Sequence, residues 1–345
     1  MSENGQVVQN SLYIYAPSKV APIIFTALFA ISAIGHVWQC CHYKSWKMSG
    51  LQPFVAVIFT AGYALREVGA FRYTYDGSQE QNLIIYIMNQ VLVYIGPPLL
   101  ELCNYHILGR MFSYIPWLSP FPPGNVLMLF GGLMGLVEAF NGIGVAFTSN
   151  PTGNKQEAGK GLVLASLSIQ LCVITSFFVM STIFLVRCFK ANIRNKAIPS
   201  LPYTLYVSMV LILIRSIYRV VQHAGNTTMN LHSQQELESL SPIMRYEWYF
   251  LVFEGATMLL NSLLWNVFNA GRFLPQDEKV FLDEDGKTEM YIPSDPNDEV
   301  SPAQLLRLVM QLLTFGLWGL VFPKKETNKE EYQTSERELN PSSSV

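Results

Sequence analysis

Seven long apolar stretches, separated by short polar connections, dominate the hydrophobic pattern of this chain. Each has about 20 residues, the length that an α-helix needs to cross about 30 Å of lipid hydrocarbon. Because backbone groups cannot remain unpaired in lipid, these stretches predict helices and not open strands. The sequence therefore predicts an all-α, polytopic membrane protein with a bundle of seven transmembrane helices. The predicted spans are residues 20–41, 52–73, 83–106, 124–147, 161–186, 201–221 and 246–268.

The distribution of Lys and Arg between the connections predicts the orientation, because positive residues near helix ends are retained in the cytoplasm. One set of connections and the segment after the last span hold Lys44, Lys47, Arg110, Arg187, Lys190, Arg194, Lys196, Arg272 and Lys279. The opposite set holds only Lys19, Lys155, Lys160 and Arg245. We therefore expect residues 1–18 to form an extracellular N-terminal segment. The sequon at Asn226 then lies on the outer side and is a candidate glycosylation site.

The chain divides into a seven-helix domain, residues 19–274, and a C-terminal region expected in the cytoplasm. Residues 275–303 are polar and acidic and predict a linker. Residues 304–322 are apolar again, with one polar stripe formed by Gln304, Arg307, Gln311 and Thr314. This pattern predicts an amphipathic helix at the membrane interface, with an eighth span as the alternative. Residues 323–345 are rich in Ser, Glu and Lys and predict a disordered tail.

Composition excludes several classes of function. The chain is 50% hydrophobic and 14% charged with a net charge of −2, so it offers no basic surface for nucleic acid. The five cysteines show no metal-binding spacing, and no cofactor motif is present. A phosphate-binding loop is also absent, so we expect no ATP hydrolysis by this chain itself. Membrane lipids are the expected partners; the sequence identifies no protein partner.

Eight charged side chains fall within the outer halves of the predicted spans. A charge at mid-bilayer costs at least about 2.5 to 3.5 kcal/mol, so such residues usually face a cavity or a partner. The eight are Arg66, Glu67, Arg72, Glu138, Arg215, Arg219, Glu247 and Glu254, and Gln222 shares a helix face with Arg215 and Arg219. We interpret them as a charge-balanced chamber that opens toward the outer leaflet and receives a charged head group. The alternative is that they form internal ion pairs that fix helix packing.

A smaller polar set lies in the inner half of the third span. Glu101, Asn104 and His106 continue into Arg110 at the membrane edge and predict an inward-facing vestibule, with helix packing as the alternative. Pro97 and Pro98 in the same span remove two backbone donors and predict an interruption or kink of the helix.

Five motifs follow one another in a specific order and spacing. They are YAPSK at 15–19, GYALREVGA at 62–70, Gln170, IRSIYRVVQ at 214–222, and EWYFLVFEGATMLL at 247–260 followed by NVFNAGRFL. In this arrangement the chain resembles the fungal lipid-translocating exporter family over about residues 15–274. The family includes aminocholesterol-resistance proteins, sphingoid long-chain base transporters and a porphyrin transporter.

The resemblance implies a non-enzymatic exporter that moves amphipathic lipids, such as sphingoid long-chain bases, across the plasma membrane and confers resistance to toxic lipids or drugs. It also places Gln170 among the substrate-binding residues. Two alternatives stay open: a seven-helix receptor or lipid-sensing regulator without transport, and an intramembrane lipid hydrolase. A metal-dependent hydrolase would need converging ligands, but His36 and His106 are predicted toward the inner side and His223 at the outer end.

Besides Glu254, where the family commonly carries Asp, the chain departs from the family pattern at two further positions. Family members usually carry Gln near the position of Glu138 and Glu at the position of Gln222, so the acid and the amide are exchanged. We interpret the exchange as a sign that both positions face one chamber whose total charge is kept.

Overall fold

A computed structural model describes residues 7–75, 79–121, 126–148, 156–191, 197–225, 238, 240–277, 280–283 and 288–291. All of them belong to the first of two units, residues 1–299. The candidate glycosylation site Asn226, the predicted interfacial helix 304–322 and the tail 323–345 lie outside the described residues, as does most of the predicted linker 275–303.

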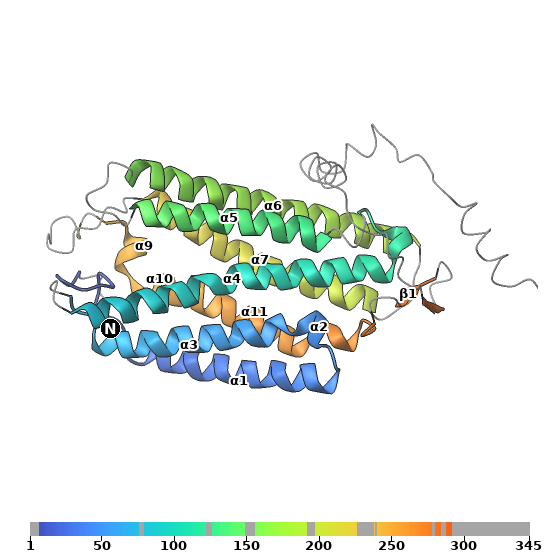
Figure 1. The fold of residues 1–345 in the computed structure, drawn as a ribbon, viewed down its shortest axis with the longest axis horizontal. Coiled ribbons are helices and arrows are strands. Elements are labelled where there is room, and N and C mark those ends of the chain that lie inside the picture. The colour runs from blue at the N-terminus through green and yellow to red at the C-terminus, as the bar shows by residue number, and fades with distance from the viewer. Residues whose placement is uncertain are drawn as a thin grey trace, which may run out of the picture. The chain divides into compact units, whose positions relative to one another are not determined.

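The described residues contain seven helices that are long and apolar enough to cross a membrane, which confirms the predicted number. Figure 1 shows these helices running alongside one another. Six are α1 Ala21–His42, α3 Leu51–Phe71, α4 Glu80–Tyr114, α5 Val126–Thr148, α6 Gln156–Lys190 and α7 Ala197–Ala224. The last span consists of α10 Glu247–Phe250, a π-helical segment η3 Leu251–Ala256, and α11 Thr257–Val267.

Short elements connect or follow the spans. They are α2 Trp46–Ser49, η1 Pro116–Leu118, α9 Pro242–Arg245 and η4 Ala270–Arg272. Strands β1 Val280–Leu282 and β2 Glu289–Tyr291 pair antiparallel within the stretch predicted as a linker. The end of α4 holds this region, because Arg110 donates to the carbonyls of Pro275 and Asp277 at 3.1 and 3.2 Å.

Neighbouring helices in the sequence mostly pack against each other. α3 packs between α1 and α4, α6 packs between α5 and α7, and α4 contacts both α5 and α7. The last span contacts α7 on one side and α1 on the other. Large apolar side chains such as Ile31 and Ile34 of α1 are exposed and face outward, as lipid-facing side chains do.

Three helices are longer than their predicted spans, and one of them is α7, with 28 residues. α4 and α6 each have 35 residues, because their polar ends continue the helix past the apolar stretch that hydropathy detects. At Pro97 and Pro98 an interruption or a kink was predicted. The interruption is wrong, because α4 runs unbroken from Glu80 to Tyr114, and the kink stays a prediction. Both prolines are buried among neighbouring helices, an environment in which a spanning helix tolerates lost backbone donors.

Buried polar side chains join helices in the middle of the bundle. The hydroxyl of Ser208 on α7 contacts Asn104 of α4 and the side chains of Asn261 and Trp265 on α11, at 2.8 to 3.2 Å. Between α1 and α11, Ser32 bonds to Ser262 at 2.6 Å. Such hydrogen bonds fix the mutual rotation of helices that lipid would otherwise leave free to turn.

A glycine pair provides a test of the α3–α4 contact. A Cβ added at Gly96 would lie 2.3 Å from the ring of Phe59, whereas a Cβ at Gly132 would meet nothing within 4 Å among the described residues. Phe59 is fully buried and stacks on Phe29 at 4.7 Å, so its ring has no free direction to move. We expect Gly96→Ala to lower the free energy of unfolding by about 1 to 3 kcal/mol. Gly132→Ala should not lower stability and is expected to raise it slightly, because Ala favours the helix more than Gly does. Thermal unfolding of the two purified variants in detergent checks this, and equal midpoints would contradict the described packing.

Candidate functional site

An ion pair near the N-terminal ends of α1 and α10 ties three segments together. The Arg66 guanidinium contacts the Glu247 carboxylate at 3.0 Å and donates to the Tyr15 hydroxyl at 3.0 Å. The second Glu247 oxygen accepts from the backbone N–H of Ser18 at 2.7 Å. We call these four residues the outer clasp, after the side of the membrane on which the sequence predicts them. Both carboxylate oxygens of Glu247 are engaged, so for Arg66 and Glu247 the structure shows an ion pair within the protein.

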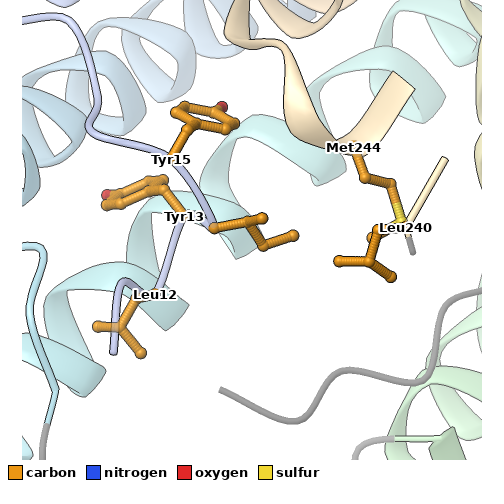
Figure 2. Packing of buried hydrophobic residues seen from close by; sticks show 6 residues of the cluster. Leu12, Tyr13, Tyr15, Leu240 and Met244 are labelled. Atoms are coloured by element: carbon orange, nitrogen blue, oxygen red, sulfur yellow. The ribbon is translucent and has the colours of Figure 1, made fainter. Parts of the chain in front are cut away.

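The outer clasp is continuous with a folded N-terminal cap, residues 7–18. The cap carries Leu12, Tyr13, Ile14 and Tyr15, which pack with Leu240 and Met244 in one buried cluster (Figure 2). Burial raises the pKa of the Tyr15 hydroxyl to about 12. The hydroxyl therefore stays neutral at physiological pH and accepts from Arg66.

Backbone contacts also attach the cap to the chain that follows α3. Ser11 and Thr74 form an antiparallel bridge, flanked by bonds from Leu12 N–H to the Tyr73 carbonyl and from Tyr75 N–H to the Asn10 carbonyl, at 2.9 and 2.8 Å. Ile14 has a φ of 72°, a left-handed conformation that is unfavourable for a β-branched residue. The cap is thus held by many contacts against local backbone strain.

A second ion pair lies deeper between α7 and the last span. Arg215 contacts Oε1 of Glu254 through two of its nitrogens, at 2.9 and 2.8 Å, and Glu254 is fully buried. Oε2 of Glu254 has no hydrogen-bond partner among the described residues. Glu254 belongs to the π-helical segment η3, a local widening that is often found at functional sites.

The other basic residue of α7 has neutral partners. Arg219 is only 7% exposed and donates to the Gln222 side chain at 2.9 Å. Its guanidinium lies 4.0 Å from the centroid of the Tyr94 ring. Within the described part of the chain no carboxylate lies within 4 Å of Arg219. The half-buried Glu138 of α5 is hydrogen-bonded to Asn141 and interacts electrostatically with both Arg215 and Arg219.

Glu101 of α4 belongs to this deeper group. It is fully buried and accepts from Gln170 of α6 at 2.5 Å and from Tyr105 at 3.1 Å. It also interacts electrostatically with Arg215 and Glu138. We call the connected residues the deep polar cluster: Glu101, Glu138, Gln170, Arg215, Arg219, Gln222 and Glu254.

The remaining predicted residues lie elsewhere. Arg72 is exposed at the end of α3, and Glu67 is half-buried with Lys19 as an electrostatic partner. His106 is half-buried, and Asn104 bonds to Ser208. The residues of the predicted chamber therefore divide between the outer clasp, the deep polar cluster and the exposed end of α3. No group of three or more potential metal ligands occurs among the described residues.

Sequence reasoning missed several partners that are neutral. Tyr94 and Tyr105 hold charged members of the deep polar cluster, and Ser18 contributes only its backbone N–H. Hydropathy gives no sign of tyrosines with such roles. For Tyr15 and Ser18 a signal existed, since both belong to the YAPSK motif at 15–19.

The comparisons identify the family. The family described as RTA1 like protein matches residues 54–277, which include every member of the deep polar cluster. The chain belongs to this family. The RTA1-like match confirms the resemblance to fungal lipid-translocating exporters and, with the seven apolar helices, a multi-pass membrane protein.

Named relatives in fungi carry transport descriptions. The "Lipid-translocating exporter-like protein RTA1" of Leptosphaeria maculans is 47% identical over 315 residues, 90% of this chain and 60% of that protein. The "Probable lipid transporter atnI" of Emericella nidulans is 23% identical over 81% of this chain and 73% of that protein. "Protoporphyrin uptake protein 1" of Saccharomyces cerevisiae is 26% identical over 74% and 91%, respectively. This chain thus spans 60% of the length of the Leptosphaeria protein. No solved structure matches it.

Proposed function

We propose that this RTA1-like chain moves amphipathic lipids across the membrane that holds it, without hydrolysing ATP itself. The observation that carries the proposal is the deep polar cluster: a connected set of charged and amide side chains buried between lipid-facing helices. Charges at membrane depth are costly and usually serve an ion, a substrate or a proton. The names of the relatives, a lipid-translocating exporter-like protein and a probable lipid transporter, support lipid as the cargo.

More specifically, we propose that the chain exports long-chain bases or related toxic amphiphiles across the plasma membrane and so confers resistance to them. The apolar tail of such a lipid stays between helices while its head group passes the deep polar cluster. In this mechanism the N-terminal cap and the outer clasp form a gate. The strained Ile14 and the contacts that hold the cap support this role, because a strained segment stays closed only while its contacts persist.

Reconstitution tests the function directly. Purified protein in liposomes is given tail-labelled sphingoid-base and aminophospholipid analogues, and a membrane-impermeant quencher reports how fast the label changes leaflet. We expect movement well above that in protein-free liposomes, in the absence of ATP. Rates equal to those of protein-free liposomes for every analogue would contradict transport and favour a receptor or regulator.

A further inference from the structure

The ion pairs leave three charged members of the deep polar cluster without an ion-pair partner. Arg66 is paired with Glu247, and Arg215 with Glu254. Among the described members of the cluster, Arg219, Glu138 and Glu101 lie within 4 Å of no oppositely charged group. Glu101 has two neutral hydrogen-bond partners, Gln170 and Tyr105, whereas Arg219 is bonded to the side chain of Gln222 and Glu138 to that of Asn141. Arg219 and Glu138 are therefore the unpaired charges of opposite sign that are also partly exposed.

Arg219 has the features of an anion site. A guanidinium carries five N–H donors and binds phosphate or carboxylate with a planar fork. Gln222 takes a bond from one nitrogen of Arg219, and the Tyr94 ring supports the guanidinium 4.0 Å from its centroid. With 7% of the residue exposed, the cation is largely removed from water. An arriving anion would therefore be attracted strongly, because little water screens the interaction.

Glu138 supplies the complementary charge. Its carboxylate is half-buried on α5 and interacts electrostatically with Arg219 across the deep polar cluster. A lipid with only an ammonium group would leave Arg219 uncompensated, and one with only an anionic group would leave Glu138 uncompensated. A head group that carries both charges satisfies the two together and leaves the net charge of the bundle interior unchanged.

We propose that Arg219 and Glu138 form a binding site for a zwitterionic head group, with the phosphate or carboxylate on Arg219 and the ammonium on Glu138. The inference rests on the proposed transport function and deepens it by naming the class of head group: it favours amphiphiles that carry both charges over long-chain bases, whose head group carries an ammonium alone. Gln222 and Tyr94 position Arg219 in this site, and Asn141 positions Glu138. The free Oε2 of Glu254, which interacts electrostatically with Arg219, is an additional acceptor for a hydroxyl or ammonium group.

The test uses three tail-labelled analogues with the same acyl chain in reconstituted liposomes: one with ammonium and phosphate, one with ammonium alone, and one with phosphate alone. Wild type is expected to move the zwitterion fastest. Glu138→Gln, which keeps the size of the side chain, should slow the zwitterion and the ammonium lipid about tenfold and spare the phosphate lipid. Arg219→Gln should slow the zwitterion and the phosphate lipid by a similar factor and spare the ammonium lipid.

Controls separate this site from general damage. Lys47→Gln and Glu80→Gln remove one exposed charge of each sign and should leave all three rates unchanged. Arg219→Lys keeps the charge without the planar fork and should give an intermediate rate for the zwitterion, which identifies a folded protein with a weakened site. If Glu138→Gln and Arg219→Lys slow all three analogues equally, the zwitterion site is wrong while transport stands. If wild type moves none of the analogues, the proposed function itself fails.

Discussion

Replacing Arg215 by Met is expected to lower the thermal midpoint strongly, whereas replacing Arg215 and Glu254 together by Met should restore most of the lost stability without restoring transport. Glu254 is fully buried, and Arg215 is its ion-pair partner at 2.8 Å. Removing one member of a buried pair leaves an uncompensated charge and costs about 3 to 5 kcal/mol, a large part of a total stability of about 5 to 15 kcal/mol. Two apolar side chains of similar volume remove both charges and avoid that cost.

The measurement is the thermal midpoint of purified variants in detergent, followed by lipid movement in liposomes. Arg272→Met is the matched control, because Arg272 is exposed and its loss should change neither quantity. A single Arg215→Met variant as stable as wild type would show that the pair is not needed to compensate Glu254. A double variant that transports normally would remove Arg215 and Glu254 from the proposed pathway.

A disulfide between positions 11 and 74 is expected to stop transport reversibly if the N-terminal cap is the gate. The flanking hydrogen bonds make Ser11 and Thr74 a non-hydrogen-bonded antiparallel pair, for which Cα atoms lie about 4.5 Å apart. This separation falls within the range of about 4.4 to 6.8 Å that disulfides need. Oxidation of Ser11→Cys/Thr74→Cys should therefore fix the cap to the chain after α3, and most of the lipid movement should be lost.

Reduction of the disulfide should restore the initial rate. The two single cysteine variants, treated with the same oxidant, control for the native free cysteines, of which Cys41 and Cys172 are exposed. They also control for the hydrogen bond that Ser11 donates to the Tyr15 carbonyl at 2.8 Å. Unchanged transport in the oxidised double variant would show that lipids reach the deep polar cluster without movement of the cap, for instance between helices.

The two ion pairs now have different interpretations, although the sequence offered one for both. In the outer clasp, Glu247 has both oxygens engaged by Arg66 and Ser18, which favours a role in holding the cap closed. In the deep polar cluster, Glu254 keeps one oxygen without a partner among the described residues, and Arg219 and Glu138 have no ion-pair partner there. Incomplete pairing of this kind favours a ligand, because an uncompensated buried charge is unstable unless a partner arrives.

The exchanged acid and amide also have a common neighbour. Gln222 accepts from Arg219, and Glu138 interacts electrostatically with the same residue. The side chains at both exchanged positions therefore interact with Arg219. This supports the interpretation that the two positions share one electrostatic environment, and it is the reason for placing the specificity of the site at Arg219 and Glu138.

The sequence by itself determined the number of spans and the location of the costly charges. Lipid imposes a helix of about 20 apolar residues on any chain that crosses it, so a one-dimensional pattern is sufficient for the count. The family followed from motifs such as YAPSK and IRSIYRVVQ in their order along the chain. The bounds of α4 and α6 could not be predicted from hydropathy, because their polar ends look like connecting loops although they continue the helix.

Only the tertiary structure decided which charges meet. Helical spacing places Arg215 and Arg219 on one face but does not show that Glu254 reaches the first and leaves the second to Gln222 and Tyr94. That outcome depends on the rotation of the last span, which the π-helical turn at Leu251–Ala256 changes without any sign in hydropathy. The contact between Glu101 and Gln170 was likewise not predictable, because the two residues lie on different helices, far apart in the sequence. Which side chains of different helices meet is decided by how the helices pack, and the periodicity within one helix carries no information about that packing.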